Sequence, residues 1–227
     1  MDQHKAKIVM DMQSIAHKNM VNRQIRSWDV LNPSILQLMR SLPRAEFIPK
    51  PYQSLAYADY PTPIGDGQVT MTPREEGRIL QALNLSPTHT LLEIGTGCGY
   101  LTALLAQRVN RVYTVEIRPH LLQHAQQCIQ RHNIDNVTFL EGNAYQGWAE
   151  YAPYDTIVVT GSMPYLPKSL SEQLNVNGEI FAVIGSQTPM MPAKWLQRTD
   201  EGWISQNIYE TYVPPLDGIP ETNNFQF

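Results

Sequence analysis

Short apolar runs alternate with amphipathic stretches through the middle of the chain, and this order predicts an α/β protein. Leu91, Leu92 and Ile94 form a run typical of a buried strand, and the apolar stretch at 101–106 predicts a helix. The same succession repeats as far as residue 184. Strands are expected at 91–94, 112–116, 137–140, 155–159 and 178–184, and helices at about 100–108, 119–132 and 167–174. Strands connected through helices pair in parallel, so the pattern predicts a doubly wound, mostly parallel sheet.

Flanking segments extend this core at both ends. Apolar residues at helical spacing predict helices over 1–41, with a helix start at Asn32-Pro33. Prolines interleaved with tyrosines at 43–63 predict an ordered loop, and a further helix is expected at about 73–85. Toward the C-terminus we expect a loop at 187–192, strands at 195–198 and 203–213 joined around 200–202, and a loose polar tail at 217–227.

Length and composition narrow the class of protein. The 227 residues suit a single domain, divided into an extension at 1–88, a cofactor-binding core at 89–186, and C-terminal strands and tail at 187–227. A net charge of −4 gives no long-range attraction to nucleic acid or anionic lipid, and no apolar run has the length of a membrane span. Cys98 and Cys128 are too few for a disulfide framework. We therefore expect a cytoplasmic monomer that binds neither nucleic acid nor a membrane.

A glycine-rich turn after the strand at 91–94 gives the first indication of a ligand. Gly95, Gly97 and Gly99 stand at alternate positions, so the turn can be tight and a ligand can lie against bare backbone. Glu116 closes the next strand, where a carboxylate accepts hydrogen bonds from both ribose hydroxyls of a nucleotide. Together these features predict a nucleotide cofactor, and a surface glutamate is the alternative interpretation of Glu116.

The spacing of the glycines indicates which cofactor is bound. The dinucleotide fingerprint G-x-G-x-x-G has a glycine at the helix start that a pyrophosphate needs, whereas this turn reads G-x-G-x-G. Glu93 lies inside the strand, an unusual place for a carboxylate. The pattern matches S-adenosylmethionine-dependent methyltransferases, and NAD is the weaker interpretation.

Polar residues at later strand ends are further candidates. Asn143 follows the strand at 137–140 and can accept a hydrogen bond from an adenine amino group, or it can simply form a turn. Asp155 begins the next strand as a capping residue or as part of the site. Ligands of open α/β sheets bind beyond the carboxyl ends of the strands, so residues 160–163 are expected near the methyl group and its acceptor.

Two other patterns are assigned no chemistry. His120 and His124 have the spacing of metal ligands on a helix, but no Glu or Cys nearby completes the set, so we expect a solvated helix face and no metal. Cys98 has no base beside it along the chain and is interpreted as a small packing residue.

Longer segments fit one family pattern. They are MVNRQIR at 20–26, LPRAEFIP at 42–49, AYAD at 56–59 and PIGDGQ at 63–68, followed by LLEIGTGCGY, APYDTIVVTGS and YVPPLDG. Their order resembles the protein-L-isoaspartate (D-aspartate) O-methyltransferase family, whose signatures include VPRxxFVP, AYxD and PIGxGQ. The resemblance implies a Rossmann-like S-adenosylmethionine-dependent methyltransferase fold with an N-terminal helical extension. It also implies methylation of the α-carboxylate of isoaspartyl residues in damaged proteins.

The resemblance implies site residues as well. For the cofactor they are Gln68, Glu93, Gly95, Gly97, Gly99, Glu116, Asn143, Ala144 and Thr160. After GxGQ the family usually reads T-I-S-x-P, with the Ser in the substrate site, whereas this chain has Met71 at the Ser position. A thioether cannot donate a hydrogen bond to a carboxylate, so Met71 predicts weak activity on isoaspartyl peptides and a more apolar acceptor. Thr70 or Thr72 is the alternative source of the hydroxyl, and these three residues are the catalytic-site candidates.

The chain departs from the family pattern at two more places, and other functions stay open. Asn143 stands where the family has an Asp, and Gly161-Ser162-Met163 replaces a run of alanines. A methyltransferase of this fold could act on a small molecule or another acceptor, and a cofactor-binding protein without repair activity would look similar. A methylation assay on an isoaspartyl peptide separates these alternatives.

Overall fold

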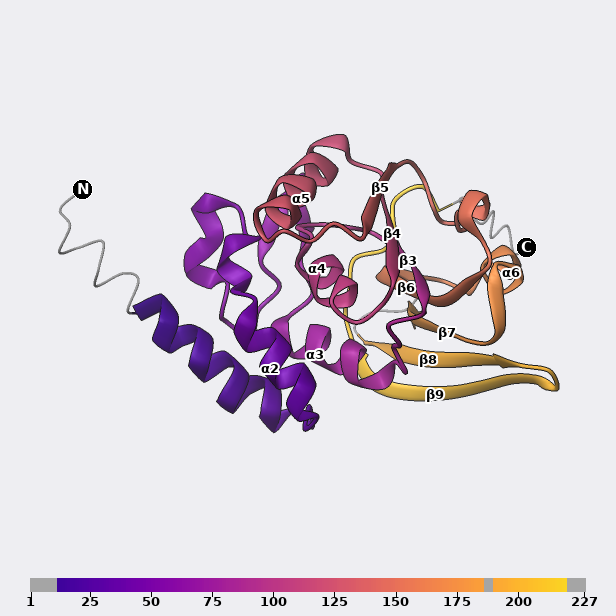
Figure 1. Ribbon diagram of the computed structural model, residues 1–227, viewed down its shortest axis with the longest axis horizontal. Coiled ribbons are helices and arrows are strands. Elements are labelled where there is room, and N and C mark those ends of the chain that lie inside the picture. The colour runs from indigo at the N-terminus through magenta and orange to yellow at the C-terminus, as the bar shows by residue number, and fades with distance from the viewer. Residues whose placement is uncertain (1–11, 186–189, 220–227) are drawn as a thin grey trace, which may run out of the picture.

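The computed structural model describes residues 12–185 and 190–219 and contains a central seven-stranded sheet. The strand order is β5-β4-β3-β6-β7-β8-β9, and the pairs among the first five are parallel while β8 and β9 are antiparallel (Figure 1). The strands are β3 (Thr90–Ile94), β4 (Arg111–Glu116), β5 (Val137–Glu141), β6 (Tyr154–Met163), β7 (Leu174–Ile184), β8 (Met191–Thr199) and β9 (Gly202–Thr211). The predicted fold class, a doubly wound and mostly parallel sheet, is confirmed.

Both faces of the sheet are covered because its central strands bury side chains in both directions. Leu91 and Val158 contribute to one hydrophobic cluster, together with residues of the N-terminal segment and of α2 to α5. Leu92 and Ile157 point into a second cluster that contains Leu170 of α6. The helices are α2 (Pro33–Ser41), α3 (Pro73–Ala82), α4 (Tyr100–Ala106), α5 (Pro119–Arg131) and α6 (Lys168–Glu172).

Short elements complete the N-terminal extension. Residues 12–19 are helical and continue into a π-helix at Met20–Ile25. A 3₁₀ turn at Arg44–Glu46, a 3₁₀ helix at Lys50–Leu55 and a two-stranded ribbon of β1 (Pro63–Gly65) and β2 (Gln68–Val69) follow. Outside the extension, a further 3₁₀ turn lies at Ala149–Tyr151. The helices predicted over 1–41 are separated by a break near Asp29, which has a positive φ of 60°. The N-terminal part of that prediction, residues 1–11, lies outside the described residues.

Local signals placed most helix starts correctly. The predicted start at Asn32-Pro33 is confirmed, because the Asn32 side chain accepts a hydrogen bond from the Ser34 N–H at 3.0 Å. Helices α3 and α5 begin at Pro73 and Pro119, as expected for proline in a first helical turn. Strands β8 and β9 turn at residues 200–201, so the predicted hairpin is also confirmed.

Element lengths in the second half of the sheet differ from the prediction. Strand β6 continues through Met163, because Ser162 and Met163 still pair with β7, and α6 is confined to Lys168–Glu172. Strand β7 begins at Leu174, where it pairs with Tyr154, and β8 begins at Met191 inside the predicted loop. These extensions come from pairing with distant strands, which local sequence patterns do not record. Of the tail predicted to be loose, residues 220–227 lie outside the described part of the chain.

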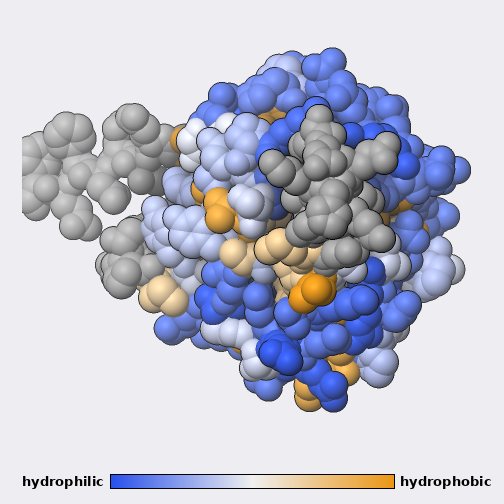
Figure 2. Space-filling model, turned by 90° about the vertical axis from the view of Figure 1, so that its left-hand side faces the viewer, coloured by the Kyte–Doolittle hydropathy of each residue, from blue (hydrophilic) through white to orange (hydrophobic). Residues whose placement is uncertain are grey.

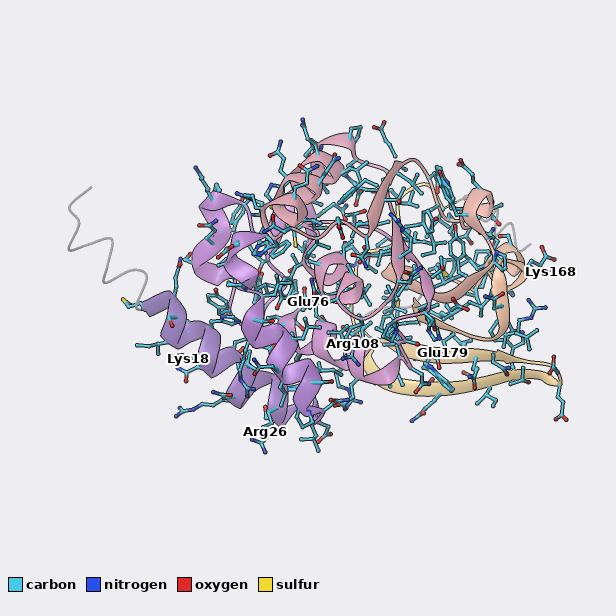
Figure 3. The ribbon with its side chains drawn as sticks, viewed as in Figure 1. Lys18, Arg26, Glu76, Arg108, Lys168 and Glu179 are labelled. Carbon is cyan, nitrogen blue, oxygen red and sulfur yellow. The ribbon has the colours of Figure 1, made fainter. Side chains whose placement is uncertain are left out.

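A buried ion pair joins the N-terminal extension to α3. Arg44 is fully buried, and its Nε donates to Glu76 Oε2 at 2.9 Å while Nη1 donates to the Ala56 carbonyl at 2.9 Å. Glu76 lies in the interior of the molecule, in contrast to Lys168, which projects from its surface (Figure 3). Burial raises the pKa of Glu76 to about 7, although Arg44 acts in the opposite direction. The 3₁₀ turn at Arg44–Glu46 is therefore held against α3 by a charge pair that has no access to water.

Arg44→Met should lower the free energy of unfolding by about 3–5 kcal/mol, because it leaves Glu76 buried without a counter-charge. Adding Glu76→Met to Arg44→Met should recover part of this loss, since the double variant contains no uncompensated charge. Urea denaturation of both variants checks this. Lys168→Met, which breaks the exposed Lys168–Glu172 pair, is the matched control and should change stability by less than about 1 kcal/mol. Strictly additive losses in the double variant would contradict the coupling.

Candidate active site

A cavity opens at the carboxyl ends of the parallel strands β3, β4 and β6, beside the turn that follows β5. The sequence-predicted residues that line it are Gln68, Gly95, Gly97, Glu116, Asn143, Ala144 and Thr160. Their positions along the chain are far apart, but parallel strands bring their carboxyl ends to one edge of the sheet. We call this the outer cavity. Glu93 and Gly99, the other two predicted cofactor residues, do not line it.

The glycine turn is shaped by contacts that exclude side chains. Gly95 has a φ of +93°, and a Cβ at this position would collide with the hydroxyl of Thr160. That hydroxyl donates to the carbonyls of Ile94 and Gly95 at 3.0 and 2.7 Å, so Thr160 fixes the turn from the neighbouring strand. Gly97, with a φ of +55°, directs its N–H toward Glu116 Oε2 at 3.0 Å. Bare backbone is thereby presented to the outer cavity.

Glu116 lines the outer cavity with a carboxylate whose orientation is fixed. Its Oε2 accepts from the Gly97 N–H at 3.0 Å and its Oε1 accepts from the Arg118 N–H at 3.1 Å. Each carboxylate oxygen has two lone pairs, so one on each oxygen is left for a ligand. This arrangement suits two adjacent hydroxyl groups, such as those of a ribose.

Glu93 serves the site from behind the glycine turn. It is fully buried, and its Oε2 accepts from the hydroxyls of Thr102 on α4 and Thr114 on β4. Thr114 in turn lies 2.6 Å from the hydroxyl of Thr96 in the glycine turn. Burial raises the pKa of Glu93 to about 7, although the two threonine hydroxyls lower it. Glu93 Oε1 has no hydrogen-bond partner among the described residues.

Gly99 has a packing role in this structure. Its φ is +84°, and a Cβ here would lie 2.9 Å from the Cβ of Ala125 on α5. The third glycine thus lets α4 start close to α5. Gly99 was predicted as a cofactor residue, but it does not line the outer cavity.

Asn143 and Asp155 both make hydrogen bonds within the protein. Asn143 lines the outer cavity, its Oδ1 accepts from the Tyr145 N–H at 2.9 Å, and its Nδ2 donates to the Gly218 carbonyl at 3.0 Å. Its turn-forming role is therefore realised, and Oδ1 keeps one lone pair for a ligand. Asp155 accepts from the Thr90 N–H at 2.7 Å and from Asn175 at 2.8 Å, both at the opposite end of the sheet from the site.

The sequence analysis missed part of the outer cavity wall. The residues concerned are Ile64, Ile117, Arg118, Leu121 and the C-terminal segment 213–217. The C-terminal segment is held by Ser162, whose N–H donates to the Pro214 carbonyl at 2.9 Å and whose carbonyl accepts from the Leu216 N–H at 3.0 Å. The sequence signals for this wall were the PIGDGQ motif, which contains Ile64, and the YVPPLDG motif, which covers the C-terminal segment.

Arg118 ties together two of the segments that border the outer cavity. It forms an ion pair with Asp217 of the C-terminal segment, and its Nε lies 3.8 Å from Asp66 Oδ2 in the β1–β2 turn. His120 Nε2 also approaches Asp66 Oδ2, at 3.3 Å. These partially exposed charges connect segments that no strand pairing joins.

A smaller inner cavity adjoins the outer one, and both are lined by Ile64, Val69, Gly95, Gly97 and Thr160. Thr70 and Met71 line the inner cavity, so two of the three catalytic-site candidates lie beside the predicted cofactor residues. Thr72 lines neither cavity. Its N–H and hydroxyl both donate to Glu75 Oε2, at 2.7 and 2.8 Å, at the start of α3.

The sequence analysis assigned no chemistry to His124 and Cys98, and the structure shows the contacts of each. His124, predicted on a solvated helix face, is partly buried and its Nε2 lies 2.8 Å from the Phe47 carbonyl oxygen. Cys98 is buried, as a packing residue should be, and burial raises its pKa to about 12. Within residues 12–185 and 190–219, no three His, Cys, Asp or Glu side chains are grouped as metal ligands. None of the described helices combines the length and apolar character needed to cross a membrane.

Comparison with known proteins gives one consistent result. The family model described as protein-L-isoaspartate(D-aspartate) O-methyltransferase matches residues 15–218. The protein-L-isoaspartate O-methyltransferase of Gloeobacter violaceus is 38% identical over 197 residues, which cover 87% of this chain and 96% of that protein. The enzyme of the same name from Picosynechococcus is 39% identical over 74% of this chain and 76% of its own length.

Solved structures agree at the level of the fold. A protein-L-isoaspartate O-methyltransferase structure has a TM-score of 0.77 and 24% identity, covering 89% of this chain and 66% of that one. A Plasmodium falciparum protein described as a putative protein-L-isoaspartate O-methyltransferase, in complex with S-adenosyl-L-homocysteine, also has a TM-score of 0.77. It is 22% identical and covers 88% of this chain and 98% of that one.

The pKa of Glu93 leads to a prediction about stability. A carboxyl whose pKa is raised by folding contributes stability below its unfolded pKa, and this contribution is lost as the pH rises through about 7. Glu93→Gln has no such titration. Relative to the wild type, this variant should gain up to about 3 kcal/mol in free energy of unfolding between pH 5 and pH 8.

Denaturant titrations of both proteins across this pH range measure the difference. Glu141→Gln, at the exposed end of β5, is the matched control for removing one carboxyl. Parallel stability curves for wild type and Glu93→Gln would contradict the assigned pKa.

Proposed function

Because this chain belongs to the protein-L-isoaspartate(D-aspartate) O-methyltransferase family, we propose that it methylates the α-carboxylate of isoaspartyl residues in damaged proteins. S-adenosylmethionine supplies an activated methyl group, and its products are S-adenosylhomocysteine and a methyl ester. The observation that carries the proposal is the family match over residues 15–218 around a cavity with the glycine turn and Glu116. Repair of the damaged residue then proceeds through a succinimide without further enzyme chemistry.

The outer cavity fits this cofactor at several points. The free lone pairs of Glu116 suit the ribose hydroxyls, and the bare backbone at Gly95 and Gly97 allows a close approach. Asn143 and Ala144 border the same cavity on the side of β5, where we place the adenine. Thr160 lines both cavities, and Gln68 lines the outer cavity next to Val69, which also lines both.

The chemistry needs positioning more than acid–base catalysis. A substrate carboxylate is ionised at neutral pH and is already a nucleophile, so no side chain has to remove a proton. The residues between the two cavities therefore act by aligning the carboxylate oxygen with the methyl group and by excluding water. This accounts for a site in which no histidine or lysine lines either described cavity.

Other assignments remain our proposals. The division at 88/89 and 186/187 separates the extension, the cofactor-binding core and the C-terminal strands. A monomer without nucleic-acid or membrane partners is supported by the net charge of −4. Most of the coloured surface on the face in Figure 2 is hydrophilic, and its hydrophobic residues lie mainly near the centre. A cytoplasmic location is supported by Cys98 and Cys128, both free and buried.

A different acceptor is the second candidate function. It is favoured by Met71, which lines the inner cavity at the position of the family's substrate-site serine. A thioether is apolar and adaptable, so this wall of the cavity would suit an acceptor with an apolar group beside the methylated atom.

The cofactor assignment predicts that Glu116→Ala weakens binding of S-adenosylhomocysteine by about 30-fold. The variant loses charged hydrogen bonds to two hydroxyls, at a cost on the order of 2 kcal/mol. Isothermal titration calorimetry measures the affinity of each variant for S-adenosylhomocysteine. Glu141→Ala, at the exposed end of the neighbouring strand, pairs in register with Glu116 and should bind as the wild type does. Equal affinity in both variants would remove Glu116 from the site.

Methylation of a synthetic isoaspartyl peptide tests the proposed function directly. The wild type should incorporate labelled methyl groups into this peptide and leave the matched aspartyl peptide unlabelled. Tight binding of S-adenosylhomocysteine without peptide methylation would favour the other acceptor class or a silent binding protein.

A further inference from the structure

The outer cavity is smaller in this conformation than the cofactor requires. Its volume is about 90 Å³, whereas pockets that enclose small-molecule ligands usually measure about 300–1,000 Å³. S-adenosylhomocysteine joins a nucleoside to an amino acid, so it needs a pocket of the larger class. Part of the cavity wall must therefore move outward whenever this ligand enters or leaves.

Two segments of the wall can move without breaking the sheet. Strands β3, β4 and β6 pair along their lengths, and the buried Glu93 ties the glycine turn to them. The β1–β2 ribbon at 63–69 and the C-terminal segment 213–217 lie outside this core, and we call them the rim segments. The ribbon strands pair with each other, and the C-terminal segment is hydrogen-bonded to Ser162 of β6.

Arg118 lies between the rim segments and makes a charged contact with each. It forms an ion pair with Asp217 of the C-terminal segment, and its Nε lies 3.8 Å from Asp66 Oδ2 in the turn of the ribbon. His120 Nε2 approaches the same Asp66 oxygen at 3.3 Å. The side chains of Asp66 and Asp217 are 55% and 41% exposed, and Arg118 lines the outer cavity. The bridge therefore lies where the cavity meets solvent.

The backbone of Arg118 has a separate role from its side chain. Its N–H donates to Glu116 Oε1 at 3.1 Å, and Glu116 is the carboxylate assigned to the ribose. The guanidinium can release both aspartates by rotation of the side chain, which leaves this backbone hydrogen bond in place. Opening the rim thus keeps the ligand-binding carboxylate in its orientation.

We infer that Arg118 is a latch: through Asp66 and Asp217 it holds the rim segments together, and its release sets the rates at which the cofactor enters and its product leaves. Arg118 is a positioning residue here, and the inference rests on the cofactor and not on the identity of the methyl acceptor. Both partners of the latch belong to the protein, so it closes over the free and the occupied cavity alike. A latch of this kind changes the rates of binding and release by the same factor and leaves the affinity unchanged.

Amide hydrogen exchange of the full chain without ligand tests the latch itself. Arg118→Met should raise exchange about fivefold in both rim segments, because a partly exposed ion pair shifts such an equilibrium by up to about that factor. Asp217→Asn should act mainly on 213–217 and Asp66→Asn mainly on 63–69. Asparagine suits the second position because Asp66 has a φ of 50°, which asparagine also adopts. Lys168→Met, which breaks the exposed pair on α6, is the matched control and should change neither segment.

Surface plasmon resonance with S-adenosylhomocysteine tests the consequence for the ligand. Asp66 does not line the outer cavity, so Asp66→Asn removes a latch contact without removing a ligand contact. In this variant kon and koff should both rise, by about threefold, while Kd stays the same. Raising the NaCl concentration should increase both rates in the wild type and have little effect in Arg118→Met, because salt screens partly exposed ion pairs.

The outcomes that overturn the inference are separate from failure of the proposed function. Unchanged hydrogen exchange in both rim segments of Arg118→Met would overturn it. So would a rise in koff without a rise in kon in Asp66→Asn, which is the signature of a lost ligand contact, or the same changes in Lys168→Met. A wild type that binds S-adenosylhomocysteine but methylates no isoaspartyl peptide refutes the function and leaves every measurement of the latch valid.

Discussion

The site is organised around one buried carboxyl group, Glu93, which needs hydrogen-bond donors because it has no access to water. Glu93 lies inside β3 with no access to water, and it draws hydroxyl groups from α4 and β4 toward one point. Through Thr114 the same network reaches Thr96 in the glycine turn. The turn therefore cannot move independently of the two strands and the helix that surround it. A ligand that lies on this backbone meets a surface that is already in place, so little ordering remains to be done on binding.

A second buried charge extends the same constraint to the N-terminal extension. Arg44 bonds Glu76 of α3, the carbonyls of Ala56 and Met71, and the hydroxyl of Thr70. Replacing such a pair with apolar groups is often neutral or stabilising, so stability alone does not explain why it is present. Its location offers an explanation, because Glu76 lines the inner cavity and Arg44 holds residues of the cavity wall. The extension thus forms part of the site as well as covering one face of the sheet.

The sequence predicted the features that depend on neighbouring residues and missed those that depend on residues far apart in the chain. The glycine turn, Glu116 and the starts of α2, α3 and α5 depend on neighbours in the chain, and they were located from short patterns. The long β6 depends on the pairing of Ser162 and Met163 with β7, and the wall at 213–217 depends on hydrogen bonds between Ser162 and the segment at Pro214, about fifty residues away. No local pattern records either contact. Gly99 was predicted as a cofactor residue from the motif, and the structure shows in addition that close packing against Ala125 requires a glycine there. Glu93 was recognised as unusual, but only the structure shows that it acts through hydroxyl groups.

The segment at Thr70, Met71 and Thr72 shows why residue type and spacing could not choose between neighbouring hydroxyls. In extended backbone, successive side chains point to opposite sides, so Thr70 and Thr72 are equivalent with respect to Met71. The structure separates them through what each hydroxyl already does. Thr72 donates to Glu75 at the start of α3, so its proton is engaged, whereas the Thr70 oxygen accepts from Arg44 and Thr62 and keeps its proton. The partner that decides is Arg44, which comes from a turn more than twenty residues earlier in the chain. Of the two hydroxyls that flank Met71, the one whose oxygen is held by a buried cation is therefore the one that keeps its proton.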